Sequence, residues 1–344
     1  MGILDKIKDT ISNSLGSTPT IKATMLGPRA VGKTSIMASI FSASRDEIAG
    51  TKLFFRPEKN TENTLSSKKL QLMNVIEKRG SLDDTPNTGA IKASSAIEPF
   101  KFEMGILGRE RSVDIVITDY PGEYLDSQPK VVSDFIEESH IVMVAIDTPY
   151  LMEENGKYNE EKNKVSRVVK FFTKHSKSIK DKMILLVPLK SELYFHEDRI
   201  EDVASRVKEV YKELIELCKK NNIACAVTPI KTLGGVEFNK FVDCNIPHSD
   251  LKKLSTYKFY GNNPQYEPMY CVQPLYYLLT YVANFYEWSQ TQDAGFFEKL
   301  KNSLLSFLKD DDEFFHEIKK LSSKVMVDKK GYYIIENNTI LNIK

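Results

Sequence analysis

Short apolar runs alternate with longer amphipathic segments along most of the chain. From Ile21 onward the apolar runs have the length of strands, and the segments between them repeat their apolar residues at helical spacing. The expected strands are 21–26, 100–106, 113–118, 141–146, 183–187 and 223–227. The expected helices between them are 33–42, 131–138, 162–175 and 200–220. Strands joined by crossover helices predict an α/β fold, with a mostly parallel sheet and helices on both faces.

An additional helix interrupts this alternation before the second expected strand. Apolar residues at helical spacing predict an inserted helix at about 61–79. The polar stretch 80–95 that follows has no core pattern, so we expect it to be mobile.

The last third of the chain has a different character, because a Tyr- and Asn-rich stretch replaces the alternation after Gly235. It leads into a long apolar helix and then into charged helices. The expected helices are about 270–288, 296–308 and 313–324. Two further apolar runs, 332–335 and 339–343, flank Asn337-Asn338 and predict a β-hairpin.

These patterns predict three segments: an N-terminal amphipathic segment and linker at 1–19, a main domain at 20–288, and a C-terminal helical and hairpin extension at 289–344. In the first segment four apolar side chains share one helical face, at Ile3, Leu4, Ile7 and Ile11. We favour packing of this face on the protein's own flank over contact with a partner or a membrane surface through residues 3–11.

Composition and charge narrow the class of protein. The 48 Lys and Arg residues against 47 Asp and Glu residues give a net charge of +1, so no global field favours stable binding to nucleic acid. No run approaches the ~18 apolar residues of a membrane span. The four cysteines and five histidines form no metal-ligand pattern. We therefore expect a soluble, cytoplasmic protein with reduced thiols.

A phosphate-binding motif lies between the first expected strand and the first expected helix. The segment 27–34 reads GPRAVGKT and matches G-x-x-x-x-G-K-[ST] in the strand-loop-helix context that the motif requires. Such a loop points successive N–H groups at an anion, with the lysine on the β- and γ-phosphates and the hydroxyl on Mg²⁺. The expected nucleotide contacts are Gly27, Arg29, Ala30, Val31, Gly32, Lys33, Thr34 and Ser35.

A second motif, Asp119-Tyr120-Pro121-Gly122-Glu123, directly follows the expected strand 113–118. A carboxylate at the end of a core strand is costly unless it meets a cation. We expect Asp119 to act with Thr34 at Mg²⁺, and Gly122 to offer its N–H to the γ-phosphate. Alone, the sequence Asp-x-Pro-Gly is also typical of a plain turn.

A base-recognition site is expected after the strand 183–187. A guanine site needs a carboxylate for the N1 and N2 protons and a lysine stem over the ring, and Lys190 and Glu192 have this spacing. The alternative is an exposed Lys and Glu at the start of a loop. Thr228 and Pro229 follow the next strand, where GTPases place the loop that packs on the base.

Together these motifs resemble the bacterial double-GTPase group of TRAFAC-like P-loop proteins. The resemblance covers roughly 21–283 and rests on GPRAVGKTS, DYPGE, VPLKSE, VTPIKTLGG and QPLYYLL in this order. It implies a Ras-like GTPase fold, GTP or GDP as ligand, Mg²⁺, and a place in a multi-protein prokaryotic conflict or antiviral defence system, with a second GTPase as one candidate partner. The family uses K-x-E, which implies that Lys190 and Glu192 recognise guanine.

Two departures from common GTPases bear on catalysis. Glu123 stands where many GTPases place a water-orienting Gln, and its charge would repel the γ-phosphate, so we expect slow hydrolysis. Arg29 replaces a common glycine and either lies over the γ-phosphate or points to solvent. Thr85 and Thr88 are both candidates for the switch threonine at Mg²⁺, and Thr88 is preferred. The expected catalytic residues are Lys33, Glu123, Arg29 and Gly122.

The motifs therefore predict a Mg²⁺-dependent guanine-nucleotide switch with slow GTP hydrolysis. Two alternatives stay open. One is a motor or assembly factor driven by ATP or GTP, which should carry a basic stripe or a membrane helix. The other is a pseudo-GTPase scaffold that binds nucleotide without hydrolysing it, which Glu123 keeps open.

Overall fold

The computed structural model describes residues 18–77, 97–179, 182–245, 251–291, 312–338 and 341. The N-terminal amphipathic face, the polar stretch 80–95, the expected helix 296–308 and most of the run 339–343 lie outside these residues. Within the described ranges, no helix is long and apolar enough to cross a membrane.

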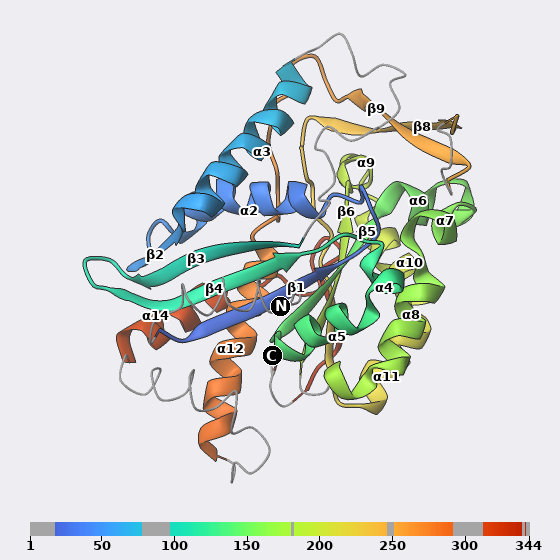
Figure 1. Cartoon of the computed structure of the whole chain (residues 1–344). Helices are drawn as coiled ribbons and strands as arrows, with labels where there is room; N and C mark the ends of the chain where they lie inside the picture. The colour runs from blue at the N-terminus through green and yellow to red at the C-terminus, as the bar shows by residue number, and fades with distance from the viewer. Residues whose placement is uncertain are drawn as a thin grey trace.

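An eight-stranded sheet forms the centre of the molecule (Figure 1). Its strands, in the order β10-β7-β6-β5-β1-β4-β3-β2, are β10 (Tyr333–Glu336), β7 (Ala224–Val227), β6 (Met183–Leu189), β5 (Ile141–Asp147), β1 (Thr20–Leu26), β4 (Arg111–Asp119), β3 (Glu98–Ile106) and β2 (Leu53–Pro57). The strands from β7 to β4 are parallel, and the strands at both margins are antiparallel to their neighbours. The predicted mostly parallel α/β fold is confirmed.

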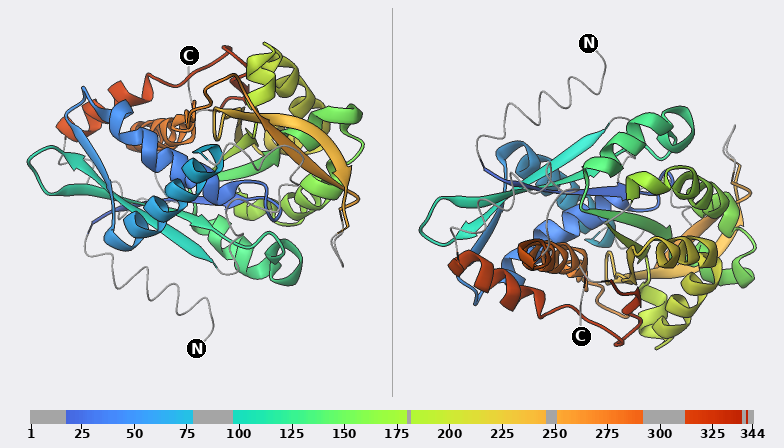
Figure 2. Two further views of the ribbon diagram at one scale, coloured as in Figure 1. Left: turned by 90° about the horizontal axis from the view of Figure 1, so that it is seen from above. Right: turned by 90° about the horizontal axis from the view of Figure 1, so that it is seen from below.

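Helices cover both faces of this sheet, because successive side chains of each central strand are apolar on both sides. In β5, Ile141, Met143 and Ala145 join one core cluster, whereas the residues between them join the other. The first cluster is covered by α2 (Lys33–Ile48), α12 (Gln273–Thr291) and α14 (Asp312–Ser322). The second is covered by α5 (Pro129–Glu138), α8 (Val165–Lys174), α10 (Ile200–Val210) and α11 (Lys212–Lys220). Figure 2 shows α12 and α5 on opposite sides of the sheet.

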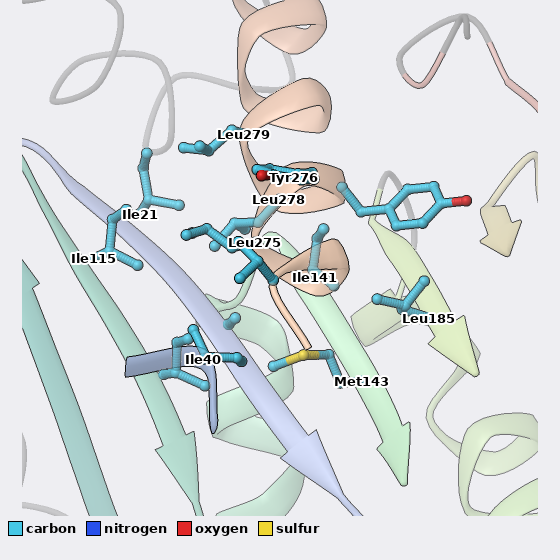
Figure 3. Packing of buried hydrophobic residues seen from close by; sticks show 14 of the residues in the cluster. Ile21, Ile40, Ile115, Ile141, Met143, Leu185, Leu275, Tyr276, Leu278 and Leu279 are labelled. Carbon is cyan, nitrogen blue, oxygen red and sulfur yellow. The ribbon is translucent and has the colours of Figure 1, made fainter. Parts of the chain in front are cut away.

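The apolar helix predicted at 270–288 is α12, and it seals the first core cluster. Leu275, Leu278 and Leu279 lie over the middle of the sheet, above Ile21 and Met143 (Figure 3). Each of these side chains is at most 2% exposed. This packing holds the parallel strands in fixed positions, so residues at their carboxyl ends are held in a defined geometry.

Two predicted helices are interrupted in the structure. The segment 200–220 divides into α10 and α11 at Tyr211, whose ring is fully buried. The segment 162–175 divides into α7 (Asn159–Asn163) and α8, because Lys164 adopts a left-handed conformation with φ 52°. The second break places Lys162 on α7 and not on α8.

Several short elements complete the main domain. The predicted inserted helix is α3 (Lys59–Glu77), and it is followed in the described chain by β3. The remaining short helices are α4 (Tyr124–Ser127), α6 (Thr148–Met152), η1 (Glu153–Gly156), η2 (Ser176–Ile179) and α9 (Glu192–His196).

The Tyr- and Asn-rich stretch contains a β-hairpin that the sequence analysis missed. Strands β8 (Val236–Asp243) and β9 (Lys253–Phe259) pair antiparallel and stand beside the end of α3 in Figure 1. Ile76 of α3 packs there with Phe238 and Tyr257. Leu193, which directly follows the predicted base-recognition motif, also packs on this hairpin.

The predicted C-terminal hairpin is described only in its first run. That run is β10, which pairs antiparallel with β7 and extends the central sheet. The helix α14 packs against α12 on the same sheet. The described residues of the predicted extension therefore share the core of the main domain.

Candidate functional site

The parallel topology brings the predicted motifs to one edge of the sheet. The segments that follow β1, β4, β5 and β6 all leave from the carboxyl ends of neighbouring strands, which is where ligands bind in folds of this kind. The loop 27–33, Asp119, Asp147 and Lys190 therefore meet, although they are far apart in the sequence.

The loop after β1 has the backbone of an anion-binding site. Gly27 and Gly32 have φ of 153° and 117°, and Gly32 caps the N-terminus of α2. The Lys33 ammonium group folds back over the loop, where its Nζ donates to the carbonyl oxygens of Gly27 at 3.0 Å and Pro28 at 3.2 Å. The lysine is thereby fixed at the centre of the loop, beside the positive end of α2.

Asp119 links this loop to the neighbouring strand. The Thr34 hydroxyl donates to its Oδ2 at 3.0 Å, and Lys33 Nζ lies 3.8 Å from its Oδ1. All three side chains are buried. Burial lowers the pKa of Lys33, and the charges of Asp119 and, secondarily, Glu123 act in the opposite direction. Thr34 and Asp119 are the two residues expected at Mg²⁺, and their side chains lie in direct contact.

Gly122 lies directly against the phosphate loop. A Cβ atom built at Gly122 would lie 2.7 Å from the carbonyl oxygen of Gly27, from the carbonyl carbon of Pro28 and from the backbone nitrogen of Arg29. Backbone atoms cannot yield to such a contact as a flexible side chain would. This position therefore requires glycine. The segment 119–123 packs so closely on the loop that it cannot move closer to it.

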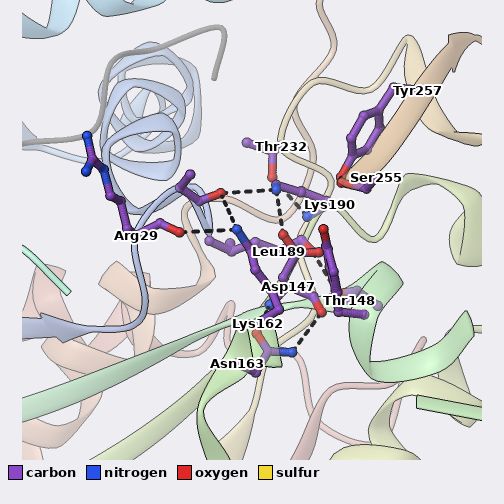
Figure 4. A network of polar contacts seen from close by, with 12 residues as sticks. Arg29, Asp147, Thr148, Lys162, Asn163, Leu189, Lys190, Thr232, Ser255 and Tyr257 are labelled. Atoms are coloured by element: carbon purple, nitrogen blue, oxygen red, sulfur yellow. Dashed lines mark hydrogen bonds and ion pairs between the residues drawn. The ribbon is translucent and has the colours of Figure 1, made fainter. Parts of the chain in front are cut away.

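The two residues expected to modify catalysis are both exposed. Glu123 precedes α4 at the surface, so its charge is largely solvated. The Arg29 side chain points away from the polar network of the site (Figure 4), in the solvent-facing orientation that was one of the two expected. Thr85 and Thr88 lie outside the described residues.

Lys190 contacts both the phosphate loop and the end of β5. Its Nζ donates to Asp147 Oδ2 at 2.6 Å and to the carbonyl oxygen of Ala30 at 3.3 Å. Burial lowers the pKa of Lys190, but the Asp147 carboxylate and the neighbouring Tyr257 and Tyr150 together outweigh that effect and raise the pKa overall. The lysine lies 5.8 Å from the centre of the Tyr257 ring on β9. Lys190 is therefore a charged group whose side chain is only 13% exposed, and not the exposed lysine of the alternative reading.

Glu192 faces the loop that follows β7. Its side chain is only 3% exposed, and its Oε1 accepts from the backbone N–H of Leu233 at 2.7 Å. Burial raises the pKa of Glu192, and the Leu233 N–H partly offsets this shift. Thr232 is also in this loop, and its hydroxyl oxygen accepts from the backbone N–H of Lys190 at 3.3 Å.

Thr228 and Pro229 are both buried, as are Ile230 and Thr232 after them. The Thr228 N–H donates to the carbonyl oxygen of Leu186 on β6, which continues the strand pairing beyond β7. Further along this segment, Thr232 bonds to Lys190, and the backbone N–H groups of Leu233 and Gly234 bond to Glu192. The contact of Thr228 and Pro229 with the base stays a prediction.

Three polar residues of the site escaped the sequence analysis: Asp147, Lys162 and Asn163. Asn163 accepts from the Asp147 N–H at 2.8 Å and donates to its carbonyl oxygen at 3.1 Å. Asp147 follows an apolar strand just as Asp119 does, and this signal was available. Lys162 lies in a polar run without a motif, so its position could not be read from the sequence.

Metal binding at this edge would depend on oxygen donors. Among the described residues, no group of three or more His, Cys, Asp or Glu is placed to hold a metal ion. Thr34 and Asp119 together offer a hydroxyl and a carboxylate, which are ligands that suit Mg²⁺ when phosphate oxygens complete the set.

Comparisons with known proteins agree with the motifs. A family model described as Double-GTPase 2 matches residues 23–231. A search of curated proteins finds no significant match. Among solved structures, the chain resembles the S. cerevisiae Ski7 GTPase-like domain bound to GDP and inorganic phosphate, at 16% identity over 66% of this chain and 45% of that one, with a TM-score of 0.39.

A second solved structure, the LeoA bacterial dynamin GTPase from ETEC, is similar at 13% identity over 93% of this chain and 41% of that one, with a TM-score of 0.31. The chain therefore spans less than half the length of either of these structures.

Proposed function

The chain belongs to the Double-GTPase 2 family, and from that membership we propose that it is a Mg²⁺-dependent guanine-nucleotide switch that hydrolyses GTP slowly. The observation that carries the proposal is the 3.0 Å contact between Thr34 and Asp119, which joins the phosphate loop to the segment that ends in Gly122. Loss of the terminal phosphate on hydrolysis would therefore affect both the phosphate loop and the segment 119–122.

The residues of this edge divide the work of binding. The N–H groups of the loop and the Lys33 ammonium group bind the phosphates, and Lys190 and Glu192 face the base. Thr34 and Asp119 would hold Mg²⁺, which neutralises charge on the phosphates. The N–H of Gly122 would distinguish GTP from GDP, and the contact of Gly122 with the phosphate loop supports this role.

Slow hydrolysis follows from the groups that flank Gly122. A carboxylate at Glu123 repels the anion that it would have to approach, and Arg29 points to solvent. Neither group therefore stabilises the transition state as the structure stands, and a partner protein is the natural source of the missing cation. The family resemblance supports such a partner within a prokaryotic conflict system, with a second GTPase as one candidate.

Isothermal titration with GDP, GTP, ADP and ATP in Mg²⁺ tests the proposal. We expect guanine nucleotides to bind and adenine nucleotides to bind much more weakly, and we expect Lys33→Met to bind neither. Asp119→Asn should shift the Mg²⁺ titration midpoint more than it shifts Mg²⁺-free GDP affinity. Equal affinity for all four nucleotides, or unchanged affinity in Lys33→Met, would contradict the assignment. Phosphate release measured in parallel separates a slow GTPase from a scaffold that does not hydrolyse.

A further inference from the structure

Ala30 adopts an unusual backbone conformation at the apex of the phosphate loop. Its φ is 58°, in the left-handed region that residues with a Cβ atom rarely occupy. Such a conformation persists only where the surrounding structure holds it in place. The neighbours of this residue are therefore the place to look for groups that maintain the loop.

Two lysines with little exposure, both outside the loop, donate hydrogen bonds to this apex. Lys162 Nζ donates to the carbonyl oxygens of Arg29 at 3.2 Å and Ala30 at 3.4 Å, and Lys190 Nζ donates to the same Ala30 oxygen at 3.3 Å (Figure 4). The two lysines come from α7 and from the loop after β6. Only 7% of Lys162 is exposed.

These hydrogen bonds determine the direction in which the N–H groups of the loop point. In a trans peptide the carbonyl and the following N–H point to opposite sides, and the described chain has no cis peptide bond. Holding the carbonyl oxygens of Arg29 and Ala30 outward therefore turns the N–H groups of Ala30 and Val31 away from the lysines. These are the N–H groups that an anion-binding loop needs.

We propose that Lys162 is a positioning residue of the nucleotide site, which holds the apex of the phosphate loop in its anion-binding form through the carbonyl oxygens of Arg29 and Ala30. The inference rests on the proposed function, since it concerns the same site. It adds a residue of α7, outside the recognised motifs, to the groups that determine nucleotide affinity.

The charges around Lys162 make its hydrogen bonds to the loop sensitive to pH. Lys33 and Lys190 face it as cations, Asp147 faces it as an anion already paired with Lys190, and the Tyr150 ring lies 5.6 Å from its Nζ. Burial, with the two neighbouring lysines, lowers the pKa of Lys162 to about 8. The charged form is therefore present at neutral pH and is lost as the pH rises through about 8.

Titration of GDP into the full chain in Mg²⁺ tests the proposal with three single variants. Lys162→Met keeps the stem and removes the charge, so affinity should fall about ten- to a hundredfold, the usual effect of losing a charged hydrogen bond. Lys162→Arg should retain most of the affinity. Lys170→Met, which removes an exposed lysine from the neighbouring helix α8, should change nothing.

Ala30→Gly provides a readout that a general loss of packing would not move. Glycine adopts a left-handed conformation without strain, so Lys162→Met should cost several-fold less affinity in the Ala30→Gly background than in the wild type. An equal loss in both backgrounds would contradict a role in holding the apex.

The pH profile supplies a second measure that does not depend on the folding of Lys162→Met. Between pH 7 and pH 9 the GDP affinity of the wild type should fall more steeply than that of Lys162→Arg, because titration of Lys33 and of the nucleotide is common to both. Identical profiles, or unchanged affinity in a folded Lys162→Met, would overturn the inference while GDP binding by the wild type stood. Absence of GDP binding by the wild type would overturn the proposed function itself.

Discussion

At the scale of single residues, the site is built from carboxylates that end core strands and from lysines that meet them. Asp119 lies 3.8 Å from Lys33, and Asp147 lies 2.6 Å from Lys190. Each carboxylate would be costly to bury alone, and removing one partner leaves the other charge uncompensated. Backbone carbonyl oxygens of the phosphate loop supply further contacts of both lysines, which hold the ammonium groups beside the loop.

Gly122 offers the sharpest test of the link between the two phosphate-contacting segments. Gly122→Ala places a methyl group 2.7 Å from three backbone atoms of the loop, so the segment 119–123 must move away from it. Such overpacking typically costs about 1–3 kcal/mol, and we expect affinity for a non-hydrolysable GTP analogue to fall tenfold or more. GDP affinity should fall less, because GDP lacks the phosphate that Gly122 meets.

Titration of both nucleotides into Gly122→Ala and into Lys130→Ala, an exposed substitution in the nearby helix α5, measures this effect. Lys130→Ala should behave as the wild type. If Gly122→Ala lost GDP and the GTP analogue equally, the glycine would be a structural requirement of the loop and not a sensor of the terminal phosphate.

Glu192 is expected to decide between guanine and adenine. A buried carboxylate matched to the N1 and N2 protons of guanine is left unpaired by adenine, whose N1 is an acceptor. Losing such a charged pair costs about 1.5–3 kcal/mol, so Glu192→Ala should reduce the preference for GTP over ATP by roughly ten- to a hundredfold.

The structure adds a control to this prediction, because Glu192 also accepts from the Leu233 N–H. Glu192→Asp keeps the charge and matches the K-x-D spacing of other GTPases, so it should retain most of the guanine preference. Competition between GTP and ATP measures the ratio for each variant. An unaltered ratio in Glu192→Ala would assign base recognition to another group.

At the scale of elements, the sequence predicted what depends on regular periodicity. The central strands and the helices α2, α3, α5, α8 and α12 appear near their expected positions, since each has an unbroken apolar pattern. Strand β8 was missed because a bulge between Phe238 and Phe241 breaks its alternation. Strand β2 is a short edge strand, and Pro57 at its end argues against a strand when only the sequence is considered.

The same distinction applies to the site. The phosphate loop, Asp119, Lys190 and Glu192 follow from motifs, because a motif fixes both residue type and place on a strand. Lys162 reaches the loop only because Lys164 turns the chain into the left-handed region between α7 and α8. Nothing in a Lys-rich polar run predicts such a break, so contacts of this kind need the structure.

His140 makes the joint between β1 and β5 sensitive to acid. Its Nδ1 accepts from the Lys22 N–H at 3.1 Å, and burial, with the charge of Lys182, lowers the pKa of His140 to about 3. Unfolding returns the pKa to an ordinary value near 6.5. Below pH 6.5 the unfolded chain therefore binds a proton that the folded chain excludes, and stability falls as the pH falls toward 3.

Urea unfolding at pH 7 and pH 5 measures this effect. The wild type should lose about 2 kcal/mol more stability across this interval than His140→Gln, which keeps a hydrogen-bond acceptor but does not titrate. Other titrating groups contribute equally to both proteins. Parallel losses in the two proteins would mean that His140 is protonated in the folded state, against the burial of its ring.

At the scale of the whole molecule, the sheet face under α12 and the carboxyl edge of the parallel strands have different roles. The α12 layer covers that face with side chains that are almost fully buried. The carboxyl edge instead carries loops that are joined by a few polar contacts, such as those of Thr34 and Lys162. Local opening costs least where few apolar contacts must break, so nucleotide state should act on the edge and leave the core unchanged.

Hydrogen exchange of the nucleotide-bound protein tests this division. A terminal phosphate at Gly122 would anchor the segment 119–125 to the loop, so its amides should exchange more slowly with a non-hydrolysable GTP analogue than with GDP. We expect the same of 80–95, which lies outside the described residues and which the sequence places as the other switch. Residues 270–283 of the α12 layer should exchange alike in both states. Two outcomes would contradict a switch: the same exchange pattern with both nucleotides, or a response confined to the C-terminal third. Either would favour a constitutive nucleotide-binding scaffold. A ligand shifts the equilibrium between two conformations only if it binds one of them better, which here requires a contact with the terminal phosphate.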